Sequence, residues 1–256
     1  MTALPNVLRP ELGPEPPAGA CRACGGAVRP VPGWRGWLAP EMCEPCAGRM
    51  VAQQEARERQ QRTEDLLALA NLPPLALKWH FRRASQEADS AAFRAVYAWE
   101  YGPEGLFLWG PVGTGKTVLA WCLLLREIRR HNRTALFLHV PDFLAELRRG
   151  FGERSASRDL ADQAKKTAVL CLDDLGAEKP TEWVREVLLA ILDHRMTHER
   201  PTVGTSNYTP GSLHRHLQDE TGRLVDRLVG ACRLVEVPGE SFRQREAEQR
   251  ANGGAP

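Results

Sequence analysis

The sequence of 256 residues has no long apolar run, and no stretch approaches the roughly 20 apolar residues that a helix needs to cross a bilayer. Its first residues lack the basic-then-apolar pattern of a signal peptide. The formal net charge is only +2, which is too small to indicate nucleic-acid binding, so any basic surface must be local. No internal repeat is present. We therefore expect a cytoplasmic chain of one large or two small domains, with no membrane partner.

Cysteine is scarce outside one region. Three of the seven cysteines stand singly in apolar stretches, where they read as buried thiols. The other four form two Cys-x-x-Cys pairs, Cys21 with Cys24 and Cys43 with Cys46, separated by 18 residues. Without a secretion signal, this spacing favours a structural zinc site with four thiolate ligands over two disulfides or four free thiols. Because four sulfur ligands leave no position for water, the site should stabilise a small fold without catalysis.

Proline and glycine mark the domain boundaries. They are nearly absent from residues 47–70, which are rich in charged residues and strong helix formers and therefore predict a long helix. Pro73 and Pro74 end that helix, because proline cannot continue one. The predicted organisation is a disordered arm (1–20), a zinc-binding module with a linker helix (21–70), a second domain (71–245) and a disordered tail (246–256).

A glycine-rich loop lies between the apolar run 106–109 and an apolar-periodic stretch that begins at Val118. A strand, a glycine loop and a helix in this order are the context of a P-loop, which a chance glycine turn would lack. Glycines let backbone N–H groups turn toward phosphate oxygens, and the helix N-terminus faces the same anion. Lys116 can reach the β- and γ-phosphates, and the Thr117 hydroxyl can ligate Mg²⁺. The predicted nucleoside triphosphate site comprises Gly110, Pro111, Val112, Gly113, Thr114, Gly115, Lys116 and Thr117.

Polar residues close two later apolar strands. Asp173 and Asp174 follow the strand predicted at 168–172, which is a Walker B pattern downstream of a P-loop. Asp173 is expected to hold Mg²⁺ through its hydration shell, and Asp174 to orient or deprotonate the attacking water. Asp174 has less reach than a glutamate. Asn207 follows the strand at 202–205 and is expected to position the water or to sense the γ-phosphate.

Two arginines, Arg223 and Arg227, stand four residues apart on one face of a predicted helix. Guanidinium groups stabilise transition-state charge on phosphoryl oxygens and can come from a neighbouring subunit. A surface ion pair with Asp226 or Asp219 is the alternative. Strands that alternate with helices between 106 and 237 predict an α/β fold, with a parallel sheet covered on both faces.

The motifs, in this order, resemble the AAA+ helicase loaders of the DnaC/DnaI type and the similar insertion-sequence helper ATPases of the IstB type. The resemblance covers roughly residues 72–245. It implies a five-stranded parallel sheet of order 5-1-4-3-2 flanked by helices, and no helical lid. It also implies Arg227 as an arginine finger, Arg223 as its companion and Arg243 as a sensor 2 residue. The segments that carry this resemblance are GPVGTGKT (110–117), LDDLGAEKPTE (172–182), RPTVGTSNY (200–208) and RLVDRL (223–228).

The same resemblance implies a spiral oligomer with ATP between subunits and single-stranded DNA in its central channel. The matching DNA positions are Thr181 and Trp183 and the helical insertion 143–166, which includes Arg148 and Arg149. The insertion has six basic and four acidic residues, so its charge of six minus four is only +2 and supports DNA binding weakly. Three aromatic residues are candidates for stacking on bases, although each is equally suited to a core: Phe143, Phe151 and Trp183.

For function, the resemblance implies an Mg²⁺-dependent ATPase of DNA replication, stimulated by DNA or by its partner. Its zinc-bearing N-terminal module would bind a replicative helicase hexamer, and hydrolysis would be coupled to release of the helicase. One alternative is a transposition helper whose partner is a transposase. Another is an ATP-gated adaptor with little turnover, which the short Asp174 side chain leaves open. The expected cofactors are ATP, Mg²⁺ and a structural Zn²⁺.

Overall fold

The structure is a computed structural model, and it falls into two compact units, residues 1–61 and 62–256. Arg243, Phe151, residues 1–12 of the expected arm and nearly all of the expected tail lie outside the described residues. Within the described ranges, no helix combines the length and the apolar content that spanning a membrane requires. The structure describes residues 13–33, 36–85, 90–149, 156–178, 181–219, 221–242, 244 and 248.

The first unit contains two short antiparallel hairpins around a very small core. Strand β1 (Gly19–Ala20) pairs with β2 (Ala27–Val28), and β3 (Val31–Gly33) pairs with β4 (Gly36–Leu38). Its apolar cluster consists of the buried residues Cys21, Val28 and Cys46 with two partly buried neighbours, and Pro30 is also buried. So little apolar burial is insufficient for an independent fold without a cross-link or a metal. Because β1 begins at Gly19, the folded module starts inside the segment that was expected to be a disordered arm up to residue 20.

Helix α1 (Glu44–Leu69) leads from the first unit into the second. Most of its length is exposed, in agreement with its charged sequence, but Leu66 and Leu67 pack against the core of the second unit. Ala70, just beyond the helix, is fully buried, and its carbonyl accepts a hydrogen bond from the Phe137 N–H. The division between the units therefore falls inside α1, earlier than the boundary that the two prolines suggested at residue 71.

The second unit is built on a five-stranded parallel sheet. Its strands are β5 (Gly105–Trp109), β6 (Ala135–His139), β7 (Val169–Leu175), β8 (Thr202–Ser206) and β9 (Cys232–Glu236). They lie in the order β6-β7-β8-β5-β9, and every neighbouring pair is parallel. Numbered from β5 along the chain, this is the order 5-1-4-3-2, so the expected topology is confirmed. Strands β5 and β6 and the start of β7 are almost continuously apolar and buried, as expected where both faces of a sheet are covered, whereas the edge strand β9 is largely exposed.

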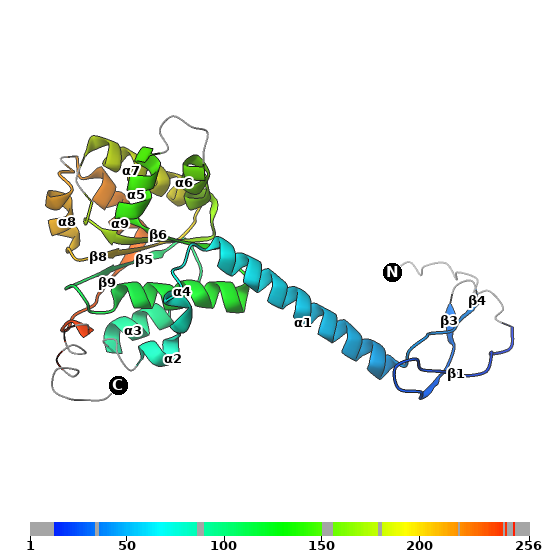
Figure 1. Ribbon diagram of the computed structural model, residues 1–256. Coiled ribbons are helices and arrows are strands. Elements are labelled where there is room, and N and C mark those ends of the chain that lie inside the picture. Colours follow the sequence, from blue (N-terminus) through cyan, green and yellow to red (C-terminus); the bar gives the residue numbers. More distant parts are fainter. Residues whose placement is uncertain are drawn as a thin grey trace, which may run out of the picture. The chain divides into compact units, whose positions relative to one another are not determined.

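Helices cover both faces of this sheet (Figure 1). Helix α4 (Lys116–His131) packs on one face with α2 (Phe81–Ala84) and α3 (Ser90–Tyr97), preceded by the short 3₁₀ helix η1 (Ala76–Lys78). The other face carries α5 (Val140–Arg149), α6 (Ala156–Lys166), α7 (Glu182–Thr197), α8 (Pro210–His216) and α9 (Arg223–Ala231). The expected insertion 143–166 thus corresponds to α5 and α6.

A fully buried arginine, Arg195 on α7, fixes where two of the strands begin. Its guanidinium donates to the carbonyl oxygens of Ala164, Thr167 and Pro201, and to Thr202 Oγ1. Burial lowers the pKa of this side chain to about 9, although carbonyl oxygens satisfy its donors. These bonds hold the start of β8 beside the residues that lead into β7, so the opposite ends of both strands reach the same edge of the sheet.

Candidate nucleotide-binding site

The loop between β5 and α4 has a backbone that requires glycine. Gly110, Gly113 and Gly115 all have positive φ, at 151°, 82° and 94°. A Cβ on Gly110 would lie 2.3 Å from the Val237 carbonyl oxygen, and one on Gly113 would lie 2.2 Å from Ser241 Oγ. Both distances are far below van der Waals contact, so side chains are excluded at both positions. The loop therefore has the turned backbone that a P-loop needs to direct N–H groups at phosphate.

Lys116, at the start of α4, folds into this loop. Its Nζ donates to the carbonyl oxygens of Gly110 at 2.8 Å and Pro111 at 2.6 Å, and only 6% of the residue is exposed. Burial lowers the pKa of the Lys116 ammonium to about 8, and the nearby carboxylates of Asp174 and Asp173 oppose this shift. The ammonium is thus a buried donor whose charge a bound phosphate would stabilise.

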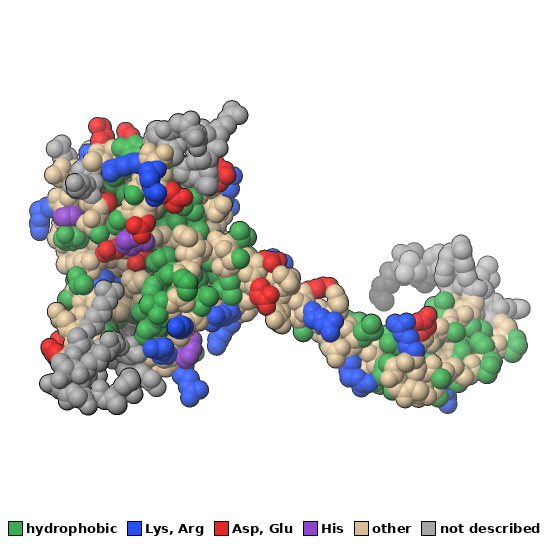
Figure 2. All heavy atoms as spheres, in the orientation of Figure 1, with side chains coloured by type: hydrophobic (Ala, Val, Ile, Leu, Met, Phe, Trp, Pro, Cys, Tyr) green, Lys and Arg blue, Asp and Glu red, His purple; other side chains and the backbone are tan. Residues whose placement is uncertain are grey.

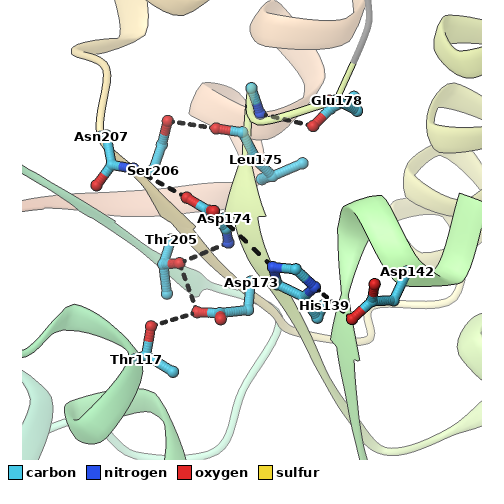
Figure 3. Close-up of polar contacts among 11 residues, drawn as sticks. Thr117, His139, Asp142, Asp173, Asp174, Leu175, Glu178, Thr205, Ser206 and Asn207 are labelled. Carbon is cyan, nitrogen blue, oxygen red and sulfur yellow. Dashed lines mark hydrogen bonds and ion pairs between the residues drawn. The ribbon is translucent and has the colours of Figure 1, made fainter. Parts of the chain in front are cut away.

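Asp173 on β7 lies directly opposite the start of α4. Thr117 Oγ1 donates to its Oδ1 at 2.8 Å, and Thr205 Oγ1 on β8 donates to the same oxygen at 2.7 Å (Figure 3). Burial raises the pKa of Asp173, and the two threonine hydrogen bonds oppose that rise. A hydroxyl and a carboxylate in contact form a set of hard oxygen donors, which suits Mg²⁺. The two residues predicted to hold Mg²⁺ are therefore adjacent.

Asp174 lies in an irregularity of β7, which corrects the sequence-based strand. The strand was expected to end at Leu172, but it continues to Leu175 with a register shift across the two aspartates. Asp174 has φ = 61°, and its N–H donates to Thr205 Oγ1 at 2.9 Å instead of to a neighbouring backbone carbonyl. Its Oδ1 accepts a hydrogen bond from Asn207 Nδ2 at 2.9 Å. The bulge turns both carboxylates toward the nucleotide side of the sheet.

Two further polar residues, His139 and Asp142, belong to this site and were not predicted. His139 ends β6, and its Nδ1 lies 2.7 Å from Asp142 Oδ2 in the first turn of α5. Its Nε2 lies 3.9 Å from Asp174 Oδ2 (Figure 3). The sequence offered a partial signal, because His139 is a polar residue directly after an apolar run, as Asp173 is.

Most of these groups line one cavity of about 1220 Å³. Ligand pockets commonly span about 300–1,000 Å³, so the cavity has room for a nucleotide. Its polar lining includes Lys116, both aspartates, Asn207 and His139. Its apolar lining includes Leu72, Trp79, Trp121 and Phe242, of which Phe242 lies against the P-loop and donates its backbone N–H to the Gly113 carbonyl. The cavity therefore offers both groups that suit phosphate and its metal and apolar side chains that suit a base.

The two candidate arginines on α9 are not among the described residues that line this cavity. Arg223 is exposed, and Arg227 Nε donates to Asp193 Oδ1 on α7 at 2.7 Å. The alternative partners Asp226 and Asp219 do not make this pair. Asp219 Oδ2 instead accepts the backbone N–H groups of Leu224 and Val225 at the start of α9. The position of Arg227 outside its own subunit's cavity is compatible with a contribution to a neighbouring site.

Three of the expected DNA-contact residues converge on the surface. Arg148 Nη2 lies 3.4 Å from Thr181 Oγ1, and its guanidinium lies 4.9 Å from the ring centroid of Trp183. Arg149 points elsewhere, because its Nε donates to the Ala145 carbonyl of its own helix. Phe143 is 98% buried, so the suggestion that it stacks on bases is wrong. Basic and acidic side chains are interspersed over the visible face of residues 62–256 (Figure 2), in agreement with the weak charge signal.

The four cysteines of the first unit come together. Their sulfur atoms all lie within 4.8 Å of one another, and Cys24 Sγ is 3.7 Å from Cys43 Sγ. Two thiolates on one tetrahedral zinc, each at about 2.3 Å, would be about 3.8 Å apart. A backbone hydrogen bond from Cys43 lowers the pKa of Cys21 to about 6, whereas hydrogen bonding with the Cys43 side chain raises that of Cys46 to about 12. Four thiols this close cannot all ionise without a cation, which is the role that zinc fits.

Comparison with known proteins identifies the family. The sequence model of the family described as "IstB-like ATP binding protein" matches residues 44–250, well over half of the chain. This chain is an IstB-like ATP-binding protein. The match includes the P-loop, both aspartates of β7, Asn207 and the arginines of α9, which confirms the family resemblance of the motifs. It begins after Cys43, so most of the cysteine cluster of this IstB-like protein precedes the family region.

Its relatives include both helicase loaders and insertion-sequence proteins. It is 32% identical over 150 residues to the replicative helicase loader DnaI of Bacillus subtilis, covering 55% of this chain and 48% of DnaI. It is 28% identical over 160 residues to the putative ATP-binding protein Rv3427c in an insertion sequence of Mycobacterium tuberculosis, covering 62% of this chain and 61% of Rv3427c. A crystal structure of DnaI matches with a TM-score of 0.57 and 29% identity, covering 66% of this chain and 95% of that chain. This IstB-like protein thus spans about half to three fifths of the length of these curated relatives.

Proposed function

We propose that this chain is an ATP-hydrolysing helicase loader of DNA replication. The observation that carries the proposal is the similarity of its ATPase domain to DnaI in both sequence and structure, at 32% and 29% identity. A separate cysteine-rich unit, joined by α1, provides a second surface for a partner. In this proposal the first unit binds the replicative helicase hexamer, and the second binds ATP and single-stranded DNA and assembles into a spiral oligomer.

The site residues have distinct roles in hydrolysis. The P-loop backbone and Lys116 bind the phosphates, and the Thr117 hydroxyl and Asp173 hold the metal. Mg²⁺, when bound, neutralises charge on the phosphate oxygens. Asp174 orients the attacking water, and Asn207 fixes the Asp174 carboxylate through its 2.9 Å hydrogen bond. Zinc, when bound by the four cysteines, stabilises the first unit.

The DNA contact in this proposal lies at Arg148, Thr181 and Trp183. Arg148 offers a cation for a phosphate, and Trp183 offers a half-buried ring on which a base could stack. Thr181 also accepts the Val184 N–H at the start of α7, so it is held by the fold as well. Arg149 is retained as a weaker candidate because its side chain lies along α5.

The deciding experiment measures the mass of the complex formed with the replicative helicase of the same genome, in ATP and Mg²⁺. The intact chain is compared with a chain that begins at Arg62, where the second unit begins. We expect a stable complex with the intact chain, no complex with the shortened chain, and equal ATP affinity for both. If neither chain binds the helicase, the loader proposal fails while the nucleotide site stands.

The family match and the Mycobacterium tuberculosis relative favour a second candidate, an ATPase that assists a transposase. It predicts a complex with a transposase of the same genome and none with the helicase. A third candidate is an ATP-gated adaptor, and the turnover of the Asp174→Asn variant distinguishes it from a hydrolysing enzyme. We expect ATP affinity to be unchanged and turnover with DNA and partner to fall at least about tenfold. If the unmutated chain turns over no faster than this variant, the protein is an adaptor.

A further inference from the structure

A row of three side chains crosses the carboxyl ends of β6 and β7. Asp142, His139 and Asp174 lie in this order, with the imidazole between the two carboxylates (Figure 3). His139 Nδ1 is 2.7 Å from Asp142 Oδ2, and its Nε2 is 3.9 Å from Asp174 Oδ2. The His139 side chain is 39% exposed and lines the same cavity as Lys116 and Asp173. The imidazole therefore faces the cavity in which the proposed nucleotide would bind.

The short contact with Asp142 determines which imidazole nitrogen is available. An ionised carboxylate only accepts hydrogen bonds, so Asp142 keeps the proton of a neutral imidazole on Nδ1. In that neutral form, His139 Nε2 is a bare acceptor. Asp174 Oδ2 is also an acceptor, and Oδ1 of the same carboxylate is already engaged by Asn207. Two acceptors 3.9 Å apart cannot bond directly, but a single water can donate one hydrogen to each.

The separation fits such a water. With hydrogen bonds of about 2.8 Å to both atoms, the angle at the water oxygen would be about 90°. This is close to the angle between the two O–H bonds of a water molecule. Both hydrogens would point at the protein, and the lone pairs of the oxygen would point into the cavity. A water held in this way presents its nucleophilic side to the γ-phosphorus.

We propose that His139 is a second catalytic residue that binds the attacking water together with Asp174; this rests on the proposed hydrolysis of ATP. The water oxygen forms a bond to the γ-phosphorus, and the bond from that phosphorus to the β–γ bridging oxygen breaks. The bridging oxygen leaves on ADP with the electron pair. One water proton passes to Asp174, and the other stays on the new phosphate oxygen.

The length of Asp174 gives the reason for a second contact. An aspartate is one methylene shorter than a glutamate, and the Asp174 oxygen nearer His139 is Oδ2, whereas Oδ1 is held by Asn207. A water held by a single hydrogen bond can rotate about that bond, whereas a second acceptor fixes its orientation. Holding a nucleophile in the reactive orientation lowers the activation free energy. His139 supplies that acceptor from the neighbouring strand, and Asp142 orients His139.

The test compares ATP affinity, KM and kcat for the full chain and its variants, with DNA and partner present. His139→Leu removes the acceptor, and His139→Gln keeps a polar atom at a similar reach. His131→Leu is the matched control, because His131 is an exposed residue at the end of α4 that does not line the cavity. We expect His139→Leu to lower kcat about tenfold or more, with ATP affinity unchanged. His139→Gln should keep more activity than His139→Leu, and His131→Leu should match the unmutated chain.

A second variant distinguishes a water contact from a purely structural role. Asp174→Glu extends the carboxylate, so it should recover part of the kcat lost in His139→Leu, which a packing defect would not allow. The proposal is overturned if His139→Leu retains the full kcat of a hydrolysing protein, or if it loses ATP affinity by the same factor as kcat/KM. In both cases the proposed ATPase activity survives. If the unmutated chain is no faster than Lys116→Ala, the proposed hydrolysis and the role of His139 both fail.

Discussion

Lys116 enters the P-loop with a pKa that burial has lowered to about 8. Near pH 8.5 the free protein therefore carries this side chain partly as a neutral amine, and the triphosphate of ATP restabilises the ammonium. ATP binding should then take up protons at pH 8.5, and affinity should fall as pH rises from about 8 toward 9. The free energy of unfolding of the ATP-free protein should change in the opposite direction and rise with pH. Between about pH 8 and the higher pKa of an unfolded lysine, the unfolded chain binds more protons than the folded one. Calorimetric titration in buffers of different ionisation enthalpy measures the uptake.

Lys116→Arg is the matched variant for this prediction. A guanidinium stays charged throughout the range, so its ATP binding should be free of proton uptake at pH 8.5. Lys116→Ala should bind no ATP at micromolar concentrations. Equal proton uptake by the arginine variant and the unmutated chain would show that another group takes up the proton.

The individual site residues were predictable to different degrees. Lys116, Thr117 and Asp173 follow from local patterns whose geometry is fixed by a strand, a loop and a helix. His139 could not be placed, because its distance to Asp174 depends on the pairing of β6 with β7 and on the bulge in β7. Neither long-range register nor a bulge has a signal in a single sequence. Thr205 was missed for the same reason, since its hydroxyl serves both aspartates only after β7 and β8 pair.

The cysteine module is the element most dependent on a bound ion. Among its described residues, the apolar cluster has just three buried members, Cys21, Val28 and Cys46. We therefore expect one zinc per chain, and loss of that zinc in Cys24→Ser, with disorder of residues 19–46. ATP affinity should be unchanged, because the nucleotide cavity lies wholly in the second unit. Metal analysis of the purified protein and amide hydrogen exchange measure the two effects.

Cys122→Ala is the control for cysteine number. Cys122 is buried on α4, and burial raises the pKa of its thiol to about 12, so it does not offer a thiolate. This variant should retain the full zinc content. A Cys24→Ser protein with unchanged zinc and unchanged exchange in the first unit would argue against a four-thiolate site.

Most core elements of the ATPase domain were predicted from apolar runs and helical periodicity. The strand order came from the family resemblance, since the sequence alone cannot tell which parallel strands become neighbours. The hairpins of the first unit were not predicted, because strands of two and three residues carry no periodic signal. The boundary near residue 71 was set from two prolines, which mark the end of a helix and not the limit of a core. Leu66 and Leu67 already belong to the second unit's core.

At the scale of the whole molecule, the described lining of the nucleotide cavity contains Arg83 but neither arginine of α9. Arg227, the expected finger, is held by Asp193 in an ion pair whose side chains are both 41% exposed. Exposed pairs of this kind stabilise a fold by about 1 kcal/mol or less, so the arginine can be released at small cost. An oligomer would then be needed to bring it to the phosphates of a neighbouring subunit.

We expect Arg227→Ala to bind ATP normally and to lose hydrolysis by at least about tenfold. Lys116→Ala has the opposite defect, because it keeps Arg227 but cannot bind the triphosphate. Mixing the two inactive variants should therefore restore part of the activity, since a Lys116→Ala subunit can offer its arginine to ATP bound by an Arg227→Ala neighbour. Arg215→Ala, which removes an exposed arginine on α8, should leave hydrolysis unchanged. If the mixture is no more active than its two components, Arg227 either acts within its own subunit or takes no part in hydrolysis.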